Sequence, residues 1–314
     1  NTSNMLLYVP VPLLTGYSTS LQNLGKVNNR GWELALTSQH TFTNGFGYSF
    51  NANYAKNTNE VKELGPGNAP IISSGSVGHA YYITEVGKPI GNYYLLVQDG
   101  IFATEEDLKK YPHFDNTEVG DFRFVDVDGD GKLDLDKDRT ICGNYMPKFT
   151  YGFGGKLWYA GFDMDFNFQG VYGNKILNLN KRYLDNMEGN TNGTKIALDR
   201  WKSPENPGSG SVNKANRKQT GYNSRTSTWH LESGSYLRLQ NLSLGYTLPR
   251  ALTQKFKVEK MRVYVSGQNL FTITNYSGYN PEVNARPSKN LTPGEDYGTY
   301  PLARTYMFGL NLTL

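Results

Sequence analysis

A short acidic segment carries the clearest chemical signal in the sequence. It reads Asp126-Val-Asp128-Gly-Asp130-Gly131-Lys132-Leu133-Asp134. This order matches the first nine positions of a calcium loop, in which positions 1, 3 and 5 supply carboxylates, position 7 supplies a backbone carbonyl, and glycine at position 6 permits the sharp turn. The twelfth position usually supplies a bidentate acid, but here it holds Lys137, and an acid follows one residue later. We therefore expect a structural Ca²⁺ ion with the ligands Asp126, Asp128, Asp130, Lys132, Asp134 and Asp138, and an ion-free acidic turn is the alternative.

No catalytic or nucleic-acid-binding pattern accompanies this loop. The four histidines show no metal-ligand spacing, and the single Cys142 forms neither a disulfide framework nor a zinc cluster. Neither a nucleophile elbow nor a glycine-rich phosphate loop is present. The net charge of +4 is spread thinly over 314 residues. We expect neither an enzyme nor a nucleic-acid partner.

Aromatic residues outside the regular segments are the candidates for substrate contact. Their rings could stack on sugars or pack against peptide side chains, although many such rings pack within the loops themselves. The residues we expect to bind substrate are Trp201, Tyr222, Trp229, Tyr276 and Tyr279.

The elements that would position these groups show a period of two. In residues 161–171, phenylalanine and methionine alternate with aspartate, asparagine and glutamine, and the preceding segment alternates in the same way up to a turn at Ala160-Gly161. Similar strands are expected near residues 32–36, 48–54, 242–246, 261–265 and 306–314. The composition agrees, because glycine and tyrosine are abundant and only 19% of residues are charged.

Strand length and loop asymmetry favour a membrane barrel over a soluble sandwich. The strands are expected to run about 10 to 14 residues, and about 10 tilted residues span roughly 23 Å, close to the apolar band of an outer-membrane barrel. Short turns near 43–45, 160–161 and 248–258 alternate with long stretches at 57–145, 173–233 and 272–301. Trp32, Tyr48, Tyr159 and Tyr246 fit an interfacial aromatic girdle.

With residues 4–27 taken as a loop, the expected strand count is seven. Bacterial single-chain barrels have even strand numbers, and an open sheet would leave unpaired backbone groups in lipid. We therefore expect residues 1–314 to be only part of a barrel, with an eighth strand before Asn1.

Motifs spread along the chain resemble the SusC/RagA-type TonB-linked outer-membrane transporters. The series begins with Asn23-Leu-Gly-Lys-Val27, Gly87-Lys-Pro-Ile-Gly-Asn-Tyr-Tyr94, Asp99-Gly-Ile-Phe102, Gly120-Asp-Phe-Arg-Phe124 and Asp199-Arg-Trp201. It continues with Ser235-Tyr-Leu-Arg-Leu-Gln-Asn-Leu-Ser-Leu-Gly-Tyr-Thr-Leu-Pro249, Arg262-Val-Tyr-Val-Ser-Gly-Gln-Asn-Leu-Phe271, Gly278-Tyr-Asn-Pro-Glu282 and Arg304-Thr-Tyr-Met-Phe-Gly-Leu-Asn311. Together these motifs cover nearly the whole chain.

The resemblance implies that residues 1–314 are the C-terminal part of a 22-stranded TonB-dependent transporter barrel, without the plug and the TonB-contacting segment. It implies an outer-membrane location in a Gram-negative bacterium, with the C-terminus on the periplasmic side. The implied function is uptake of oligosaccharides or peptides. The implied partners are a SusD-like surface lipoprotein as a lid, the N-terminal barrel and plug part, TonB through that part, and outer-membrane lipid. The alternatives are a calcium-stiffened, surface-exposed glycan-binding β-protein and a passive porin.

Overall fold

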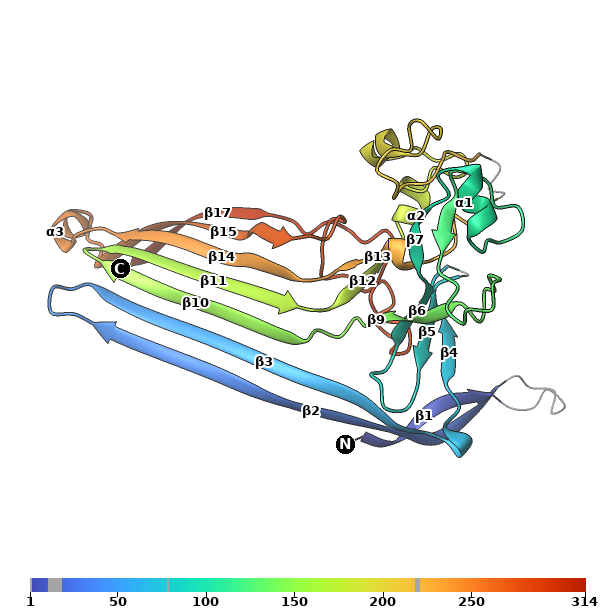
Figure 1. The fold of residues 1–314 in the computed structure, drawn as a ribbon. Coiled ribbons are helices and arrows are strands. Elements are labelled where there is room, and N and C mark those ends of the chain that lie inside the picture. The colour runs from blue at the N-terminus through green and yellow to red at the C-terminus, as the bar shows by residue number, and fades with distance from the viewer. Residues whose placement is uncertain (1, 11–18, 78, 218–220) are drawn as a thin grey trace.

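One long antiparallel sheet dominates the computed structural model, which describes residues 2–10, 19–77, 79–217 and 221–314 (Figure 1). The sheet has eight strands in the order β1-β2-β3-β10-β11-β14-β15-β17 and does not close on itself. Their bounds are β1 Thr2–Pro10, β2 Thr19–Thr41, β3 Gly47–Leu64, β10 Phe149–Tyr159, β11 Phe162–Tyr172, β14 Tyr236–Thr247, β15 Lys260–Thr274 and β17 Thr305–Thr313. The expected all-β fold, part of a transmembrane antiparallel barrel, is confirmed.

The N-terminal region corrects the expected count of seven strands. Residues 2–10 form β1, which pairs with residues 19–27 of β2, so the region 4–27 is not simply a loop; residues 11–18 lie outside the described part of the chain. β2 and β3 also run farther than expected, over 23 and 18 residues, so residues 57–64 belong to a strand. The outer half of this hairpin pairs through backbone hydrogen bonds, which need no apolar alternation in the sequence.

Strand register brings the apolar side chains of seven strands onto one face of the sheet. One row across the sheet joins the partners Leu36, Ala52, Phe153, Phe168, Leu239 and Phe271, and another joins His40, Tyr48, Leu157, Met164, Leu244, Val265 and Phe308. Because side chains alternate between faces, the intervening positions form the polar face. Many apolar side chains remain exposed; Phe308 is 87% exposed. An apolar face of this extent requires lipid or another partner to cover it.

Two rows of aromatic rings border this apolar face. Rings stack in sequence from Trp32 to Tyr54, Phe149 and Tyr172, with centroids 4.9 to 5.1 Å apart. The second row lies near the short turns and contains Phe42, Phe46, Tyr159, Phe162 and Tyr246. On β10 the rows are ten residues apart, about 33 Å along the strand and about 25 Å along the membrane normal at a tilt near 40°. This separation is that of the two girdles of an outer-membrane barrel.

Aromatic side chains also cross glycines on neighbouring strands. Tyr264 pairs with Gly309, and a Cβ at that glycine would lie 2.1 Å from the phenol ring. Trp158 lies across Gly47 in the same way, with 2.2 Å to the indole ring. Each ring therefore occupies the space that a side chain at its partner position would take.

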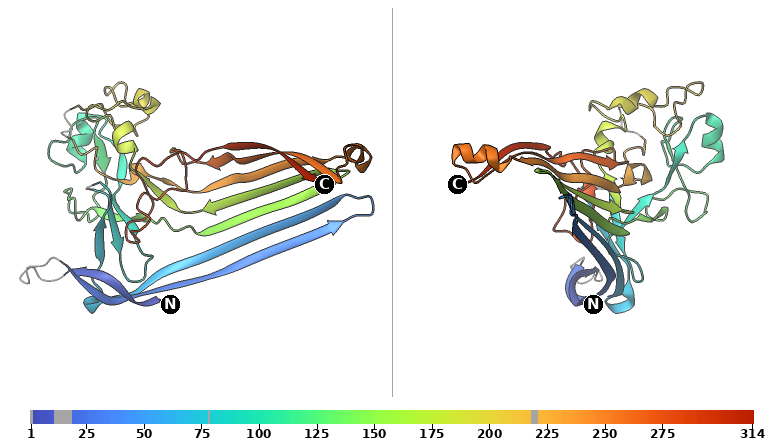
Figure 2. Two further views of the ribbon diagram at one scale, coloured as in Figure 1. Left: turned by 180° about the vertical axis from the view of Figure 1, so that it is seen from behind. Right: turned by 90° about the vertical axis from the view of Figure 1, so that its left-hand side faces the viewer.

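The long connections collect at one end of the sheet, in the same place whether the molecule is seen from the front or from behind (Figures 1 and 2). We call residues 65–148, 173–235 and 275–304 the loop body, and the opposite end the turn end. The loop body contains three small sheets: β4 (Ile71–Ser74), β5 (Tyr81–Thr84), β6 (Asn92–Leu96) and β9 (Arg139–Gly143); β7 (Gln98–Ile101) and β8 (Phe122–Phe124); and β12 (Lys175–Asn178), β13 (Leu231–Ser233) and β16 (Glu295–Asp296).

Short helices complete the molecule. The loop body holds α1 (Glu105–Lys110), α2 (Lys181–Leu184), η2 (Pro66–Asn68), η3 (Lys195–Asp199) and η4 (Thr228–His230), and the turn end holds α3 (Arg250–Thr253) and η5 (Gln254–Phe256). None of the helices in the described ranges has both the length and the apolar character needed to cross a bilayer.

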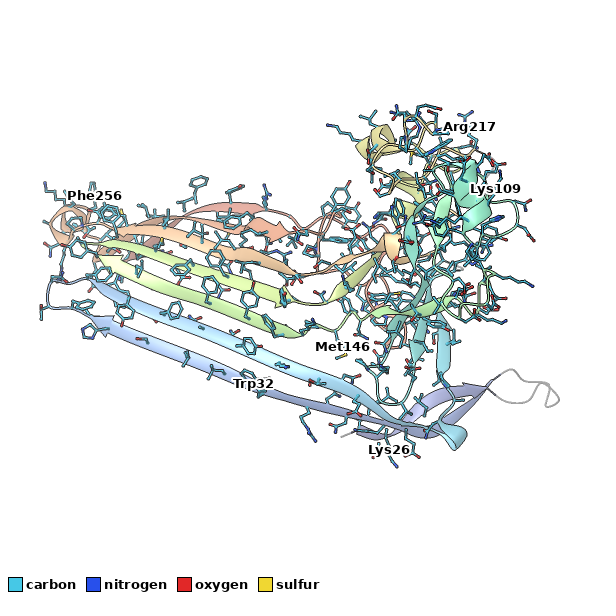
Figure 3. All side chains as sticks on the ribbon, viewed as in Figure 1. Lys26, Trp32, Lys109, Met146, Arg217 and Phe256 are labelled. Atoms are coloured by element: carbon cyan, nitrogen blue, oxygen red, sulfur yellow. The ribbon has the colours of Figure 1, made fainter. Side chains whose placement is uncertain are left out.

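The loop body has its own apolar core. One cluster takes residues from β5, β6 and the β12 region, namely Ala80, Tyr82, Tyr93, Leu95, Leu177 and Leu179, all with no exposed surface. A second cluster contains Leu96, Ile101, Phe114, Phe122 and Phe124. Figure 3 shows the resulting difference: side chains crowd together at the loop end, while those of the long strands point away from the sheet. The connections between strands are thus packed structure.

Candidate functional site

The acidic segment lies between β8 and β9 and forms a turn in which backbone amides donate hydrogen bonds to its carboxylates. Carboxylate oxygens of Asp126, Asp128 and Asp130 lie within 4.8 Å of one another. Asp126 accepts hydrogen bonds from the amides of Gly129 (2.7 Å) and Gly131 (2.8 Å). These amides, with that of Gly131 first, hold the pKa of the Asp126 carboxyl below its usual value. The segment therefore brings three carboxylates together at one place.

The two more distant acids of the loop hold its shape. Asp138 is buried, and its two carboxylate oxygens accept hydrogen bonds from the amides of Val127 (2.7 Å) and Asp134 (2.6 Å). Asp134 accepts hydrogen bonds from the next turn, at Asp136 N (2.7 Å) and Lys137 N (3.1 Å). Asp138 thus fastens both ends of the loop together through the backbone.

Apolar contacts attach the acidic loop to the core of the loop body. Leu133 and Leu135 pack against the cluster that contains Phe114 and Phe124. Gly129 and Gly131 have φ angles of 74° and 81°, where a side chain would be strained, and nothing lies within 4 Å of a Cβ built at either position. Their glycine identity therefore serves the turn itself rather than close packing.

Four of the five aromatic residues expected to bind substrate lie within the packing of the loop body. Tyr222 stacks on Phe114 with centroids 4.2 Å apart, and Trp201 donates its indole hydrogen to Ala103 O at 3.2 Å. Trp229 packs against Phe122 and lies beneath the ammonium group of Lys181, and Tyr276 is buried and donates to Asp296. Burial and the Asp296 carboxylate raise the pKa of Tyr276 above its usual value. These four rings stabilise the loop body.

The fifth, Tyr279, is 81% exposed and lines a cleft of about 410 Å³ in the loop body. Tyr300, which the sequence reasoning did not single out, lines the same cleft and is 90% exposed. The polar residues of this cleft include Asn178, Lys181, Asp185 and Thr194. Tyr279 and Tyr300 come from the 275–304 connection, whereas these polar residues come from the end of β12 and the segment that follows it, so only the folded chain brings the two groups together.

A polar cluster around Arg238 joins this connection to the wall of the sheet. Arg238, on the polar face of β14, forms an ion pair with Glu282 and donates hydrogen bonds to Asn280 (2.8 Å) and Thr272 (2.9 Å). Tyr236 also donates to Glu282. Arg238 and Tyr236 belong to the sequence block 235–249, and Asn280 and Glu282 to the block 278–282, so the structure brings two of the motifs into contact.

The rest of the polar face carries amides toward the loop end and charges toward the turn end. Asn53, Asn167 and Gln169 lie in its loop-end half, and at the turn end Arg262 makes two hydrogen bonds with Asp163, at 2.8 and 2.6 Å. Asp163 and Asp165 share this face, as expected for a polar pore wall. Asp163 is engaged in this ion pair.

Comparison with known proteins assigns this architecture. The chain is 34% identical over 99% of its length to TonB-dependent receptor P3 of Formosa agariphila and 26% identical over 99% to TonB-dependent receptor SusC of Bacteroides thetaiotaomicron. No protein-family profile matches the chain. The fold matches a solved structure of the RagAB peptide transporter with a TM-score of 0.76 and 25% identity over 99% of this chain.

The chain is similar in sequence to TonB-dependent receptors, SusC among them, and similar in fold to the RagAB peptide transporter. The resemblance inferred from the motifs is thereby confirmed. The chain spans about one third of the length of these relatives: 31% of P3, 29% of SusC and 32% of the matched RagAB chain. In the described residues the eight-stranded sheet is open.

Proposed function

We propose that the chain forms part of the barrel wall and the outer loops of a TonB-dependent importer of oligosaccharides or peptides in the outer membrane. The observation that carries this proposal is the sheet with one apolar face between two aromatic rows about 25 Å apart. The turn end then faces the periplasm and the loop body faces outward, because outer-membrane barrels have short periplasmic turns and long external loops.

The open edges of the sheet support a role as part of a larger barrel. β1 and β17 are the edge strands and leave a row of backbone groups without sheet partners. Unpaired peptide groups are costly in hydrocarbon, so strands from the rest of the transporter must cover both edges. The remaining part would also supply the plug that fills the polar lumen and the segment that contacts TonB.

A lid partner follows from the loop body. The packed core of the loop body fixes the positions of the surface residues around it. The RagAB structures that match this fold are described as a peptide transporter and as a peptide importer in open and closed states. We propose that a SusD-like surface lipoprotein covers the loop body and captures substrate with it.

Within the loop body, Tyr279 and Tyr300 are the proposed substrate contacts. Two exposed phenol rings beside Asp185 and Asn178 offer apolar faces and hydrogen-bonding groups in one cleft. Rings of this kind stack on sugars and pack against peptide side chains. Replacing both tyrosines by alanine should raise the substrate concentration for half-maximal uptake while leaving the amount of folded transporter unchanged.

We also propose that the acidic loop binds Ca²⁺ as a structural ion. Three carboxylates converge there, and the turn is already formed by hydrogen bonds, among them those from the amide of Gly131 to Asp126 and from the amide of Lys132 to Asp130. The ammonium nitrogen of Lys137, at the twelfth position, lies 3.8 Å from a carboxylate oxygen of Asp130 and places a positive charge beside the cluster. A divalent cation would neutralise the cluster more completely.

The first test of the transport proposal is extraction of the native protein in mild detergent, followed by a native gel and mass spectrometry of every co-migrating polypeptide. Peptides of the remaining barrel and plug, together with a surface lipoprotein, are the expected result. A folded, detergent-independent chain without partners would instead support the surface-exposed glycan-binding protein, and a closed barrel without plug peptides would support the porin.

A further inference from the structure

We propose that the crevice at which β3 and β10 separate binds the phosphorylated headgroup of a glycolipid in the outer leaflet. The crevice occupies about 480 Å³ and is lined by Tyr54, Lys56 and Thr58 from one side and by Asn144, Lys148 and Phe149 from the other. Its occupant is a membrane lipid, so the inference rests on the outer-membrane placement proposed above.

The crevice exists because two paired strands diverge. β3 and β10 are paired from Gly47 opposite Trp158 to Ala55 opposite Thr150, and beyond this last pair β3 continues alone with β2. Figure 3 shows Met146, another lining residue, beside the opening between β3 and the start of β10. The sheet thus leaves a gap in its wall on the loop-end side.

The depth of the crevice corresponds to lipid headgroups. Tyr54 and Phe149, at its floor, belong to the aromatic row that borders the apolar face, and their centroids are 5.1 Å apart. Aromatic rows of this kind lie at the boundary between hydrocarbon and headgroups. A lipid whose chains run along the apolar face would therefore have its headgroup at the level of Lys56 and Lys148.

The charge at this place is positive and uncompensated. No aspartate or glutamate lines the crevice, and Lys56 and Lys148 are both exposed. Among the ion pairs of the described residues, those nearby on β2 and β3 join Lys26 to Glu63 and Lys62 to Glu60, and neither crevice lysine takes part in one. Arg30, exposed opposite Thr58, adds a third positive charge to the rim.

A phosphorylated glycolipid suits this combination better than a free anion. Lysine ammonium groups attract phosphate as point charges. The exposed polar side chains of Asn57 and Thr58 provide hydrogen-bonding groups for sugar hydroxyls. The apolar face directly below provides the surface for acyl chains, which inorganic phosphate would not use.

The test compares two purified full-length transporter complexes. One is wild type, and the other carries both Lys56→Gln and Lys148→Gln. Binding of fluorescent, phosphorylated lipid A in detergent micelles is measured by retention on the immobilised complex. Each lysine near an anionic headgroup strengthens binding roughly fivefold, so we expect the double variant to bind about 25-fold more weakly. The matched control is Lys109→Gln with Lys110→Gln, on α1 in the loop body and away from the crevice (Figure 3). It should bind like wild type.

Two further arms identify the source of the phosphate. Lipid A without its phosphates should bind wild type and the double variant equally weakly, and inorganic phosphate in large excess should not displace the phosphorylated lipid. Equal binding of phosphorylated lipid to wild type and double variant would overturn the proposal, and so would displacement by inorganic phosphate. Heat-dependent gel migration and substrate uptake, measured on the same samples, report the barrel and transport separately, so a failure of either is distinguishable from a failure of lipid binding.

Discussion

At the scale of single residues, carboxylates act in two different ways in this chain. Asp126, Asp128 and Asp130 turn their charges toward one another in an exposed loop, whereas Asp138 and Glu295 are buried and accept hydrogen bonds from backbone and side chains. The spacing of the first group is visible in the sequence. The partners of the second group are not, because Glu295 lies 219 residues from Ser76 along the chain.

The acidic loop, for which we propose Ca²⁺ binding, gives the first prediction. Asp128→Asn together with Asp130→Asn removes two of the converging charges and should weaken Ca²⁺ binding about tenfold or more, because affinity in such loops follows the number of charged ligands. Limited proteolysis of the segment 125–138 with and without Ca²⁺ measures this. The exposed Asp99→Asn variant serves as control. Equal cleavage of wild type in both conditions would contradict the site.

Glu188 gives a prediction about pH. Its side chain is buried beside Asn223, and its pKa is raised to about 7, first by burial and then by Asp121, against the lowering effect of Asn223, Ser224 and Arg182. The folded state then holds a proton that the unfolded state releases between about pH 4.5 and 7, so the loop body loses stability as pH rises through this window. Hydrogen exchange around Asn186 and Asn223 should be faster at pH 8 than at pH 5.5.

The control for this titration is Glu188→Gln, which keeps the shape of the side chain but cannot ionise. Its exchange rates, corrected for intrinsic pH effects, should be nearly equal at the two pH values. A wild-type protein with the same corrected rates at both pH values would show that Glu188 does not titrate in this range.

At the scale of the elements, the two faces of a strand predict opposite responses to charge. Phe166 lies near the middle of β11 on the apolar face, and Asn167 lies next to it on the polar face. Phe166→Arg should destabilise the inserted barrel by about 2–4 kcal/mol, whereas Asn167→Arg should be tolerated, because the first charge enters lipid and the second enters the lumen. The amount of folded, heat-modifiable transporter in outer membranes measures both, and equal yields would contradict the membrane placement.

The same alternation explains how much of the architecture could be predicted from the sequence. Strands β10, β11 and β17 carry a regular period of two, so their faces and the turn at Ala160-Gly161 follow from the residues. The outer part of β2 and β3 and the strand β1 do not alternate in this way, because that hairpin extends past the apolar band and is held by backbone pairing. For this reason the expectation of a loop was wrong at residues 4–10 and 19–27.

At the scale of the whole molecule, the three connections depend on one another. Glu295 has no exposed surface and accepts hydrogen bonds from the Ser76 amide (3.0 Å) and the Tyr82 hydroxyl (3.1 Å), which join the last connection to the first. Glu295→Gln should lower the protease resistance of residues 65–84 although the substitution lies more than 200 residues away. Limited proteolysis with Asp99→Asn as control measures this, and cleavage confined to the 275–304 connection would contradict the coupling.

The aromatic candidates show what the sequence could not supply at this scale. The sequence does not distinguish Tyr222, Trp229 and Tyr279, because each is an aromatic residue in a segment without a regular period. In the structure, Tyr222 and Trp229 pack against an apolar core, whereas Tyr279 faces solvent. That difference depends on where three distant connections meet. No local sequence pattern indicates this difference in burial, and for the same reason the sequence did not indicate Tyr300 as a candidate.

The glycines beneath Tyr264 and Trp158 bear on how the barrel assembles without error. A shift of one strand by one residue would turn its apolar side chains into the lumen and its polar side chains toward lipid, which is energetically unfavourable. Sliding it by two residues keeps every side chain on its proper face, and hydrophobicity cannot detect the shift. In that misaligned pair Met307 or Asn311 would replace Gly309 opposite Tyr264, and the phenol ring would collide with a side chain. The ring-and-glycine pairs thus disfavour this two-residue mispairing, which the alternation of faces does not.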